Sequence, residues 1–298
     1  MRLRSVELQL ADVAAAARFL QRTWGLLPAG GEAGVRFFRG SGDHPYILSL
    51  REAATPAVGA ITFAGAAAEL DALQVRLRAG NTPARPFAVL DAPGGGAGFT
   101  VSGPEAQVYC FVTDSTVAPV AAANDTPMQI THAVLNALDV AACERFAVDV
   151  LGFTVSDRTR AMTFVRCDRK HHAVAYAHAD VASLNHIAFE MRDIDAVMRG
   201  FGRMREAGFA PVWGPGRHGP GNNVFGYFIA PFGAVIEYTA EVSEVGDDYR
   251  VGNPEEWKWP PGRIDHWGVS VKDSAPIMLA ERTFRFPTAV EGAAPAPG

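Results

Sequence analysis

The stretch VELQLADVAAAARFLQRTWGL, residues 6–26, recurs as AVLNALDVAACERFAVDVLGF at residues 133–153, an offset of 127 (133 against 6). The same offset matches VRFFRGSGDHPYILSL, residues 35–50, with MTFVRCDRKHHAVAYA, residues 162–177. Self-similarity at one fixed spacing over two separate segments indicates that a single structural unit occurs twice in the chain.

Each copy predicts the same order of local structure. An alternation of apolar and polar residues opens the copy, which is typical of a β-strand. Asp12 and Asp139 then stand where a helix would be capped, and Gly25 and Gly152 stand where it would end. Shorter apolar segments follow, so we interpret the unit as β-α-β-β-β. Two weaker copies are found at residues 60–80 and 185–208.

The four units predict an α+β fold of four βαβββ modules, paired into two domains that are each a curved mixed sheet around a cavity. The predicted first domain covers residues 1–113, and an Ala-, Pro- and Thr-rich linker covers 114–129. The second domain covers 130–241, and an extension covers 242–298. The last residues of the extension, VEGAAPAPG, have little to bury and are expected to be flexible.

Composition argues against several classes of protein. The net charge of −5 comes from interspersed acids and bases without a long basic run, so we expect no nucleic-acid partner. The chain shows neither an apolar run of roughly 18 residues nor a signal peptide, which favours a cytoplasmic protein without membrane contact. The cysteines Cys110, Cys143 and Cys167 lack CxxC spacing, so we expect reduced thiols.

The two halves differ in chemical kind at three matched positions. The pairs are His132 with Ser5, His186 with Gly59 or Ala60, and Glu237 with Tyr109. The second half therefore holds two imidazoles and one carboxylate, from three predicted strands, where the first half holds nothing that would bind a metal well. This set suits non-haem Fe(II) and its reactions with O₂. Mn(II) is a plausible substitute, and Zn(II) also accepts the same ligands.

Glu237 supports the metal hypothesis because it lies in the apolar segment GAVIEY, where an unpaired carboxylate is expensive. Taken singly, each of the three residues is interpretable as an ordinary strand residue. Their coincidence at matched repeat positions favours a shared cation, which would stabilise the buried charge better than a surface lysine.

Several polar residues are candidates for the surroundings of the metal. His172 shares a predicted strand face with Val174 and Tyr176, whereas His171 points the other way, matches His44, and is interpreted as a structural or surface residue. The loop GRHGPGNN contributes further candidates, and a strand after it contributes an aromatic residue. These candidates are His218, Asn222, Asn223 and Tyr227.

The second half resembles the catalytic domain of a type I extradiol ring-cleavage dioxygenase, similar to catechol 2,3-dioxygenases, in the vicinal oxygen chelate superfamily. The residues that carry the resemblance are His132, the HH pair at 171–172, NHIAFE, GPGRHG and the stretch that ends in IEY. The resemblance implies two vicinal oxygen chelate domains, of which the first is metal-free and the second catalytic. It also implies an aromatic diol as the small-molecule substrate, O₂ as co-substrate and a homo-oligomer.

The resemblance assigns roles to the candidates. It implies that the Fe(II) ligands are His132, His186 and Glu237, that the acid/base is His172, and that the ring oxygens of the substrate are hydrogen-bonded by His218 and Tyr227. Trp213 stands where some relatives that cleave carboxylate-bearing catechols have an arginine, and it would favour an aromatic or apolar substituent. Asn222 and Asn223 remain possible substrate contacts.

Two other functions compete with ring cleavage. A ligand-sequestering resistance protein of the same superfamily would use the cavity without catalysis, which the intact ligand set and His172 argue against. Another metalloenzyme on this scaffold, such as a lyase, an isomerase or a hydroquinone-cleaving oxygenase, generally lacks the combination of His172, His218 and Tyr227. The tryptophans in the extension are interpreted mainly as packing residues.

Overall fold

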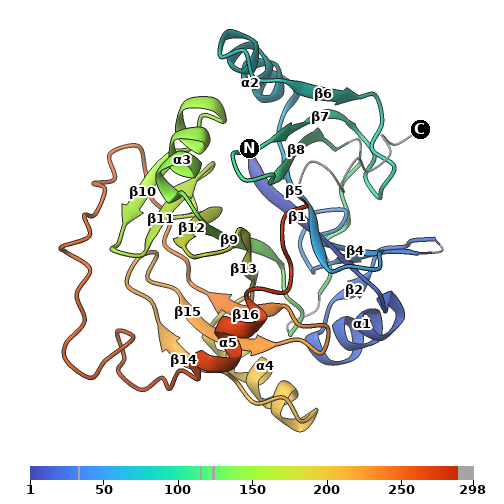
Figure 1. Ribbon diagram of the computed structural model, residues 1–298. Coiled ribbons are helices and arrows are strands. Elements are labelled where there is room, and N and C mark those ends of the chain that lie inside the picture. Colours follow the sequence, from blue (N-terminus) through green and yellow to red (C-terminus); the bar gives the residue numbers. More distant parts are fainter. Residues whose placement is uncertain (33, 115, 123–124, 288–298) are drawn as a thin grey trace.

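The computed structural model describes residues 1–32, 34–114, 116–122 and 125–287. The expected flexible end of the chain, from 288 onward, lies outside the described residues. Two mixed sheets of eight strands each dominate the molecule, and the helices are few and short (Figure 1). The predicted α+β fold of paired βαβββ modules is therefore confirmed.

The first sheet is built from the N-terminal half. Its strands are β1 (Arg2–Leu10), β2 (Leu27–Pro28), β3 (Val35–Arg39), β4 (Leu48–Glu52), β5 (Ala57–Ala64), β6 (Ala84–Phe87), β7 (Ala97–Ser102) and β8 (Val108–Thr113). Its helices are α1 (Val13–Phe19), the π-helical turn η1 (Leu20–Trp24) and α2 (Ala67–Ala79). The strand order is β2-β3-β4-β1-β5-β8-β7-β6, so the two modules meet where β1 pairs with β5.

The second sheet repeats this order with β10-β11-β12-β9-β13-β16-β15-β14. Its strands are β9 (Gln129–Ala137), β10 (Thr154–Arg158), β11 (Met162–Arg166), β12 (Val174–His178), β13 (Ser183–Glu190), β14 (Trp213–Arg217), β15 (Val224–Ile229) and β16 (Val235–Ala240). Its helices are α3 (Val140–Arg145), the π-helical turn η2 (Phe146–Val150) and α4 (Ile194–Glu206). The two modules of this half meet where β9 pairs with β13.

The repeated helix signals act as the sequence indicates. The carboxylates of Asp12 and Asp139 each accept the backbone N–H three residues later, at 2.8 and 2.9 Å, and so cap α1 and α3. Gly25 and Gly152 follow the helical segments with φ of 96° and 78°, a backbone region in which glycine is favoured. The same local chemistry therefore starts and ends the first helix of both halves.

Strand register corrects the matching of the two halves by one residue after β3. The parallel partner of Ala133 is Val174, whereas the equivalent Val6 pairs with Leu48, which is an offset of 126 rather than 127 (174 against 48). The loop before β4 is one residue longer than the loop before β12. Tyr46 is consequently the counterpart of His172 in the first half.

A similar correction applies to the counterpart of Glu237. Ile187 pairs with Ile236, and the equivalent Ile61 pairs with Tyr109. The residue that follows Tyr109, Cys110, therefore corresponds to Glu237, which lies within the one-residue uncertainty of the match to Tyr109. A buried thiol in the place of the carboxylate leaves the first half without the predicted ligand set.

One continuous hydrophobic core joins the two halves. Trp24, at the end of η1, stacks face to face on Tyr238 of β16 with ring centroids 3.6 Å apart. Arg203 of α4 donates hydrogen bonds to the Tyr238 hydroxyl at 2.8 Å and to the carbonyl of Thr23 at 2.8 Å. This contact locks the helical segment of the first half against the strand that carries Glu237.

The extension returns to the second sheet after a long excursion, drawn from orange to red in Figure 1. It includes the short helix α5 (Ser274–Ala280), which lies near β14 and β16. Backbone hydrogen bonds tie it to both halves, from Leu184 to Phe284 at 2.8 Å and from Val58 to Arg285 at 3.0 Å. Among the described residues, no helix combines the length and the apolar character that crossing a membrane requires.

We predict that Trp24→Ala lowers the free energy of unfolding by about 3–5 kcal/mol, because it removes a fully buried indole from the contact between the halves. Urea denaturation followed by circular dichroism measures the change. The matched control is Leu279→Ala, whose side chain is 74% exposed and should change the stability by less than about 0.5 kcal/mol. Equal losses in the two variants would contradict this account.

Candidate metal centre

Three neighbouring strands bring one predicted ligand each to the same point. His132 lies on β9, His186 on β13 and Glu237 on β16, and β13 pairs with both of the other strands. The Oε2 atom of Glu237 is 3.4 Å from Nε2 of His132 and 3.2 Å from Nε2 of His186. The three candidate ligand atoms lie within 4.8 Å of one another, and all three residues are buried. The structure thus brings the predicted set together.

These residues fit a divalent cation. His186 Nε2 and Glu237 Oε2 are buried and have no hydrogen-bond partner in the part of the chain that the structure describes, although the two atoms are 3.2 Å apart. Buried polar atoms are rarely left unsatisfied. Two imidazoles and a carboxylate on one side of a site are also a known ligand set for non-haem Fe(II), Mn(II) or Zn(II). A cation shared by the three groups would satisfy them.

Neighbouring amides orient the ligands. His186 Nδ1 is 2.7 Å from Oδ1 of Asn185, so Nδ1 carries the proton that is donated and Nε2 keeps its lone pair toward Glu237. Asn223 donates from Nδ2 to Glu237 Oε1 at 3.3 Å and to Thr239 Oγ1 at 2.8 Å. Asn223 therefore holds the carboxylate by one oxygen and leaves the other facing the imidazoles.

Electrostatics favours an ionised carboxylate beside neutral imidazoles. Burial by itself would raise the pKa of Glu237, but its interactions with the neighbouring His132 and His186 outweigh burial and lower the pKa. Burial lowers the pKa of His132, against the opposing effect of Glu237. Neutral imidazole and ionised carboxylate are the forms that bind metals.

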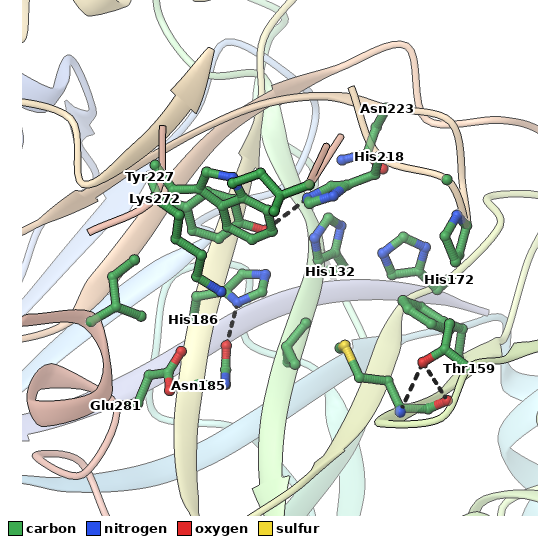
Figure 2. Close-up of a pocket in the computed structure, with 18 of the residues that line it drawn as sticks. His132, Thr159, His172, Asn185, His186, His218, Asn223, Tyr227, Lys272 and Glu281 are labelled. Atoms are coloured by element: carbon green, nitrogen blue, oxygen red, sulfur yellow. Dashed lines mark hydrogen bonds between the residues drawn. The ribbon is translucent and has the colours of Figure 1, made fainter. Parts of the chain in front are cut away.

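Two of the candidate ligands, His132 and His186, line a pocket of about 240 Å³ (Figure 2), and Glu237 lies against both of them. His172, His218, Asn223 and Tyr227 contribute polar groups near the ligands. Apolar side chains cover another wall. These are Val134, Met162 and Phe164. The extension supplies a further wall, which is formed by Trp259, Ile264, Lys272, Ile277 and Glu281.

His218 and Tyr227 form a buried hydrogen-bonded pair in this pocket. His218 Nε2 is 2.9 Å from the Tyr227 hydroxyl, as Figure 2 shows, and its ring stacks on Phe225 with centroids 3.9 Å apart. Burial lowers the pKa of His218 to about 3, and burial together with Glu237 raises the pKa of Tyr227 well above 10. Both groups are therefore neutral near pH 7 and can exchange hydrogen bonds with a ligand.

Comparisons with known proteins agree with this arrangement. Residues 129–238 match the model of the Glyoxalase/Bleomycin resistance protein/Dioxygenase superfamily. A solved structure, the Mn(II)-bound glyoxalase from Novosphingobium aromaticivorans, is 32% identical to the chain and has a TM-score of 0.83, covering 97% of this chain and 95% of that one. The chain belongs to this superfamily.

Two further relatives are named as dioxygenases or metapyrocatechases. Metapyrocatechase 2 of Cupriavidus necator is 29% identical over 156 residues, which is 49% of this chain and 46% of that protein. The match thus spans about half the length of this curated relative. The 2,3-dioxygenase LapB from Pseudomonas sp. KL28 is 19% identical with a TM-score of 0.78, over 86% of this chain and 98% of that one, and shares the fold.

The remaining candidate substrate contacts differ in whether they line the pocket. Trp213 lines the pocket, stacks on Tyr227 with ring centroids 5.0 Å apart, and donates from Nε1 to Ser270 Oγ at 3.2 Å. Asn223 lines the pocket as well. Asn222 does not, because its side chain is exposed and its backbone, with φ of 50°, forms the turn of the loop. The structure does not place Asn222 where it could contact a substrate.

The paired histidines His171 and His172 lie in different surroundings. His172 lines the pocket, with its ring centroid 4.2 Å from that of His132. His171 is 1% exposed and contacts Asp157, so of the two alternatives interpreted from the sequence, a structural or a surface residue, it is the buried structural one. The alternation of the sequence indicated the direction in which His171 points, but it could not reveal that the Asp157 carboxylate lies there.

Sequence reasoning missed several residues that line the pocket. Asn185, which orients a ligand, has no signal beyond its position directly before His186. Lys272 places its ammonium 4.1 Å from the ring centre of Trp213, and Glu281 faces the same pocket from the chain segment after α5. Both come from the extension, which the repeat does not cover, so matching the two halves could not find them.

We predict that Glu237→Ala abolishes stoichiometric metal binding, because the imidazoles would lose the only carboxylate of the predicted set. Inductively coupled plasma mass spectrometry of protein loaded with Fe(II) or Mn(II) under anaerobic conditions measures the metal content. Glu206→Ala, at an exposed position of α4, is the control and should bind metal as the wild type does. Full metal occupancy in Glu237→Ala would refute the ligand assignment.

Proposed function

We propose that the protein is an extradiol ring-cleaving dioxygenase that opens a catechol-type diol next to its vicinal hydroxyls with O₂, giving a ring-opened semialdehyde-type acid. The observation that carries the proposal is the convergence of two groups of side chains on one pocket. His132 and His186 line the pocket and meet Glu237, and the hydrogen-bonding residues His172, His218 and Tyr227 line the same space. The curated relative named metapyrocatechase supports the same activity.

The proposed metal is Fe(II), with Mn(II) as the alternative. The unsatisfied Nε2 of His186 and Oε2 of Glu237 are the atoms of this chain that call for a cation. When bound, Fe(II) would supply open coordination positions for the diol oxygens and for O₂, and a path for electrons between them. His132 would complete the three protein ligands.

The chain's own side chains would manage the protons. Tyr227 and His218, already hydrogen-bonded to each other at 2.9 Å, would hold the oxygens of the diol by further hydrogen bonds. Burial and the neighbouring histidines lower the pKa of His172 well below 6.5, so its ring is neutral near pH 7 and can accept a proton at Nε2. His172 can return that proton to the reacting oxygen later in the cycle.

The walls of the pocket would place the aromatic ring and exclude water. Phe164 and Met162 offer apolar surface on one side, and Trp213 offers an aromatic face on another. A ring held between these walls loses its freedom before the reaction, which lowers the entropic part of the barrier. Trp213 at this position favours a diol with an aromatic or apolar substituent.

A second candidate is a metal-dependent lyase or isomerase that does not consume O₂. It is favoured by the 32% identical Mn(II)-bound glyoxalase, whose match extends over nearly the whole of both chains. The fold and the metal ligands suit both functions. The residues that favour ring cleavage are His172, His218 and Tyr227, because they surround the cavity beside the metal ligands with groups that can move or hold protons.

Oxygen consumption distinguishes the two candidates. The protein, reconstituted anaerobically with Fe(II) or Mn(II), is given catechol, 3-substituted catechols and hydroquinone in an oxygen electrode. We expect uptake of one O₂ per diol, together with the absorbance of a ring-opened product, for at least one vicinal diol. Uptake with hydroquinone alone would indicate a hydroquinone-cleaving oxygenase, and no uptake on any diol would favour the lyase or isomerase.

We predict that His172→Phe lowers kcat by about 10²–10⁴-fold, because it removes the proton acceptor from the pocket and leaves the metal ligands in place. Steady-state oxygen uptake measures kcat, and metal analysis of the same sample confirms that the site is loaded. The control is His178→Phe, the same substitution at an exposed position, which should leave kcat unchanged. A fully active His172→Phe variant would remove His172 from the mechanism.

A further inference from the structure

A line of buried hydrogen bonds leads away from the pocket behind His172. His172 Nδ1 is 3.0 Å from His171 Nδ1, and His171 Nε2 is 2.8 Å from Asp157 Oδ2. The three side chains are at most 3% exposed. Asp157 lies on β10, and both histidines lie in the loop that leads into β12.

The directions of these hydrogen bonds follow from the acceptors of Asp157. Its Oδ1 accepts the backbone N–H of Gly252 at 2.7 Å, and its Oδ2 is 3.2 Å from the Tyr249 hydroxyl, which donates to it. Both oxygens of this carboxylate already accept hydrogen bonds, and a carboxylate acts as an acceptor only. His171 Nε2 must therefore carry the proton of the hydrogen bond to Asp157.

The tautomer of His172 follows from that of His171. A neutral imidazole with a proton on Nε2 has only a lone pair on Nδ1, so His171 Nδ1 accepts from His172 Nδ1–H. His172 Nε2 then carries the lone pair. The hydrogen bonds of the described residues include none at Nε2 of His172, and His172 lines the pocket. The lone pair is thus available to a ligand in the cavity.

The first half of the molecule shows that this line of hydrogen bonds is not needed to build the fold. By strand register, Pro45 and Tyr46 stand where the second half has His171 and His172. Gly30 accepts the backbone N–H of Phe37 and so stands opposite Phe37, as Asp157 stands opposite Phe164. The first half forms the same eight-stranded sheet without them. The line of hydrogen bonds therefore occurs in the half that contains the candidate metal ligands. Burying its polar side chains costs free energy, and building the fold does not explain why they are there.

We propose that Asp157 and His171 are positioning residues that fix the tautomer of His172, so that Nε2 faces the pocket as a proton acceptor. The extension takes part, because its Gly252 and Tyr249 hold the Asp157 carboxylate. The consequence for turnover rests on the proposed dioxygenase function, whereas the tautomer is a property of the folded chain alone.

Asp157→Asn tests the proposal with one atom changed. The backbone N–H of Gly252 keeps the amide oxygen in the place of Oδ1, so the amide nitrogen takes the place of Oδ2 and presents a donor to His171 Nε2. His171 must then accept at Nε2 and donate from Nδ1, which makes His172 accept at Nδ1 and carry its proton on Nε2. The line of hydrogen bonds is preserved, but the lone pair no longer faces the pocket.

The tautomer is measured directly by long-range ¹⁵N–¹H correlation spectra of the full-length, metal-free chain labelled with ¹⁵N-histidine. The His172 signals are assigned by their loss in His172→Phe. We expect a protonated Nδ1 and an unprotonated Nε2 in the wild type, and the reverse in Asp157→Asn. A wild-type spectrum with the proton on Nε2 overturns the proposal, and this outcome decides even if Asp157→Asn does not fold.

A kinetic measurement links the tautomer to turnover. With a diol that the wild type consumes, Asp157→Asn should lower kcat by about 10–100-fold, with KM and metal content unchanged. Asp71→Asn, the same substitution at an exposed position of α2, should keep the wild-type kcat. An unchanged kcat in Asp157→Asn, with its tautomer reversed, overturns the positioning role. If no diol is consumed, the dioxygenase proposal fails while the spectra still decide the tautomer.

Discussion

The buried carboxylate of Glu237 faces two imidazoles inside the second sheet, and a cation that the three groups could share would offset its charge. The need to compensate this charge explains why three adjacent strands each place a polar side chain at one point. It also explains why Asn223 and Asn185 are fixed by hydrogen bonds around that point, since a loosely held ligand would leave a charge unpaired. The pocket and the polar residues that line it are arranged around this buried carboxylate.

Much of the fold could be predicted because its signals are local and repeated. Asp12 and Asp139 cap the equivalent helices, and the alternation in each copy marks the first strand. Comparison of the halves also identified the three candidate metal ligands, because a residue that changes chemical kind between two copies of one fold stands out. The sequence alone did not give the exact first-half counterpart of His172. A constant offset matches His172 with Pro45, but the loop before β4 has one additional residue, so Tyr46 is the true counterpart.

The residues that sequence reasoning missed share one physical property, which is that they act through contacts distant in the chain. Asp157 lies 14 residues from His171 and receives a hydrogen bond from Gly252, which is 95 residues away. No periodicity or spacing marks such a residue. Lys272 and Glu281 belong to a segment without a copy in the other half, so no internal comparison was possible. Only the folded chain reveals these neighbours.

The extension has a consequence for how this molecule could diversify. The candidate metal ligands lie on strands of the second sheet, whereas part of the pocket wall comes from a single segment outside the sheets, which backbone and side-chain hydrogen bonds hold against them. Substitutions in that segment can reshape the space offered to a ring substituent without moving a ligand. Evolution, or a protein engineer, could therefore alter the choice of substrate and the reactive centre separately, with residues such as Lys272 and Ile277 as the variable part.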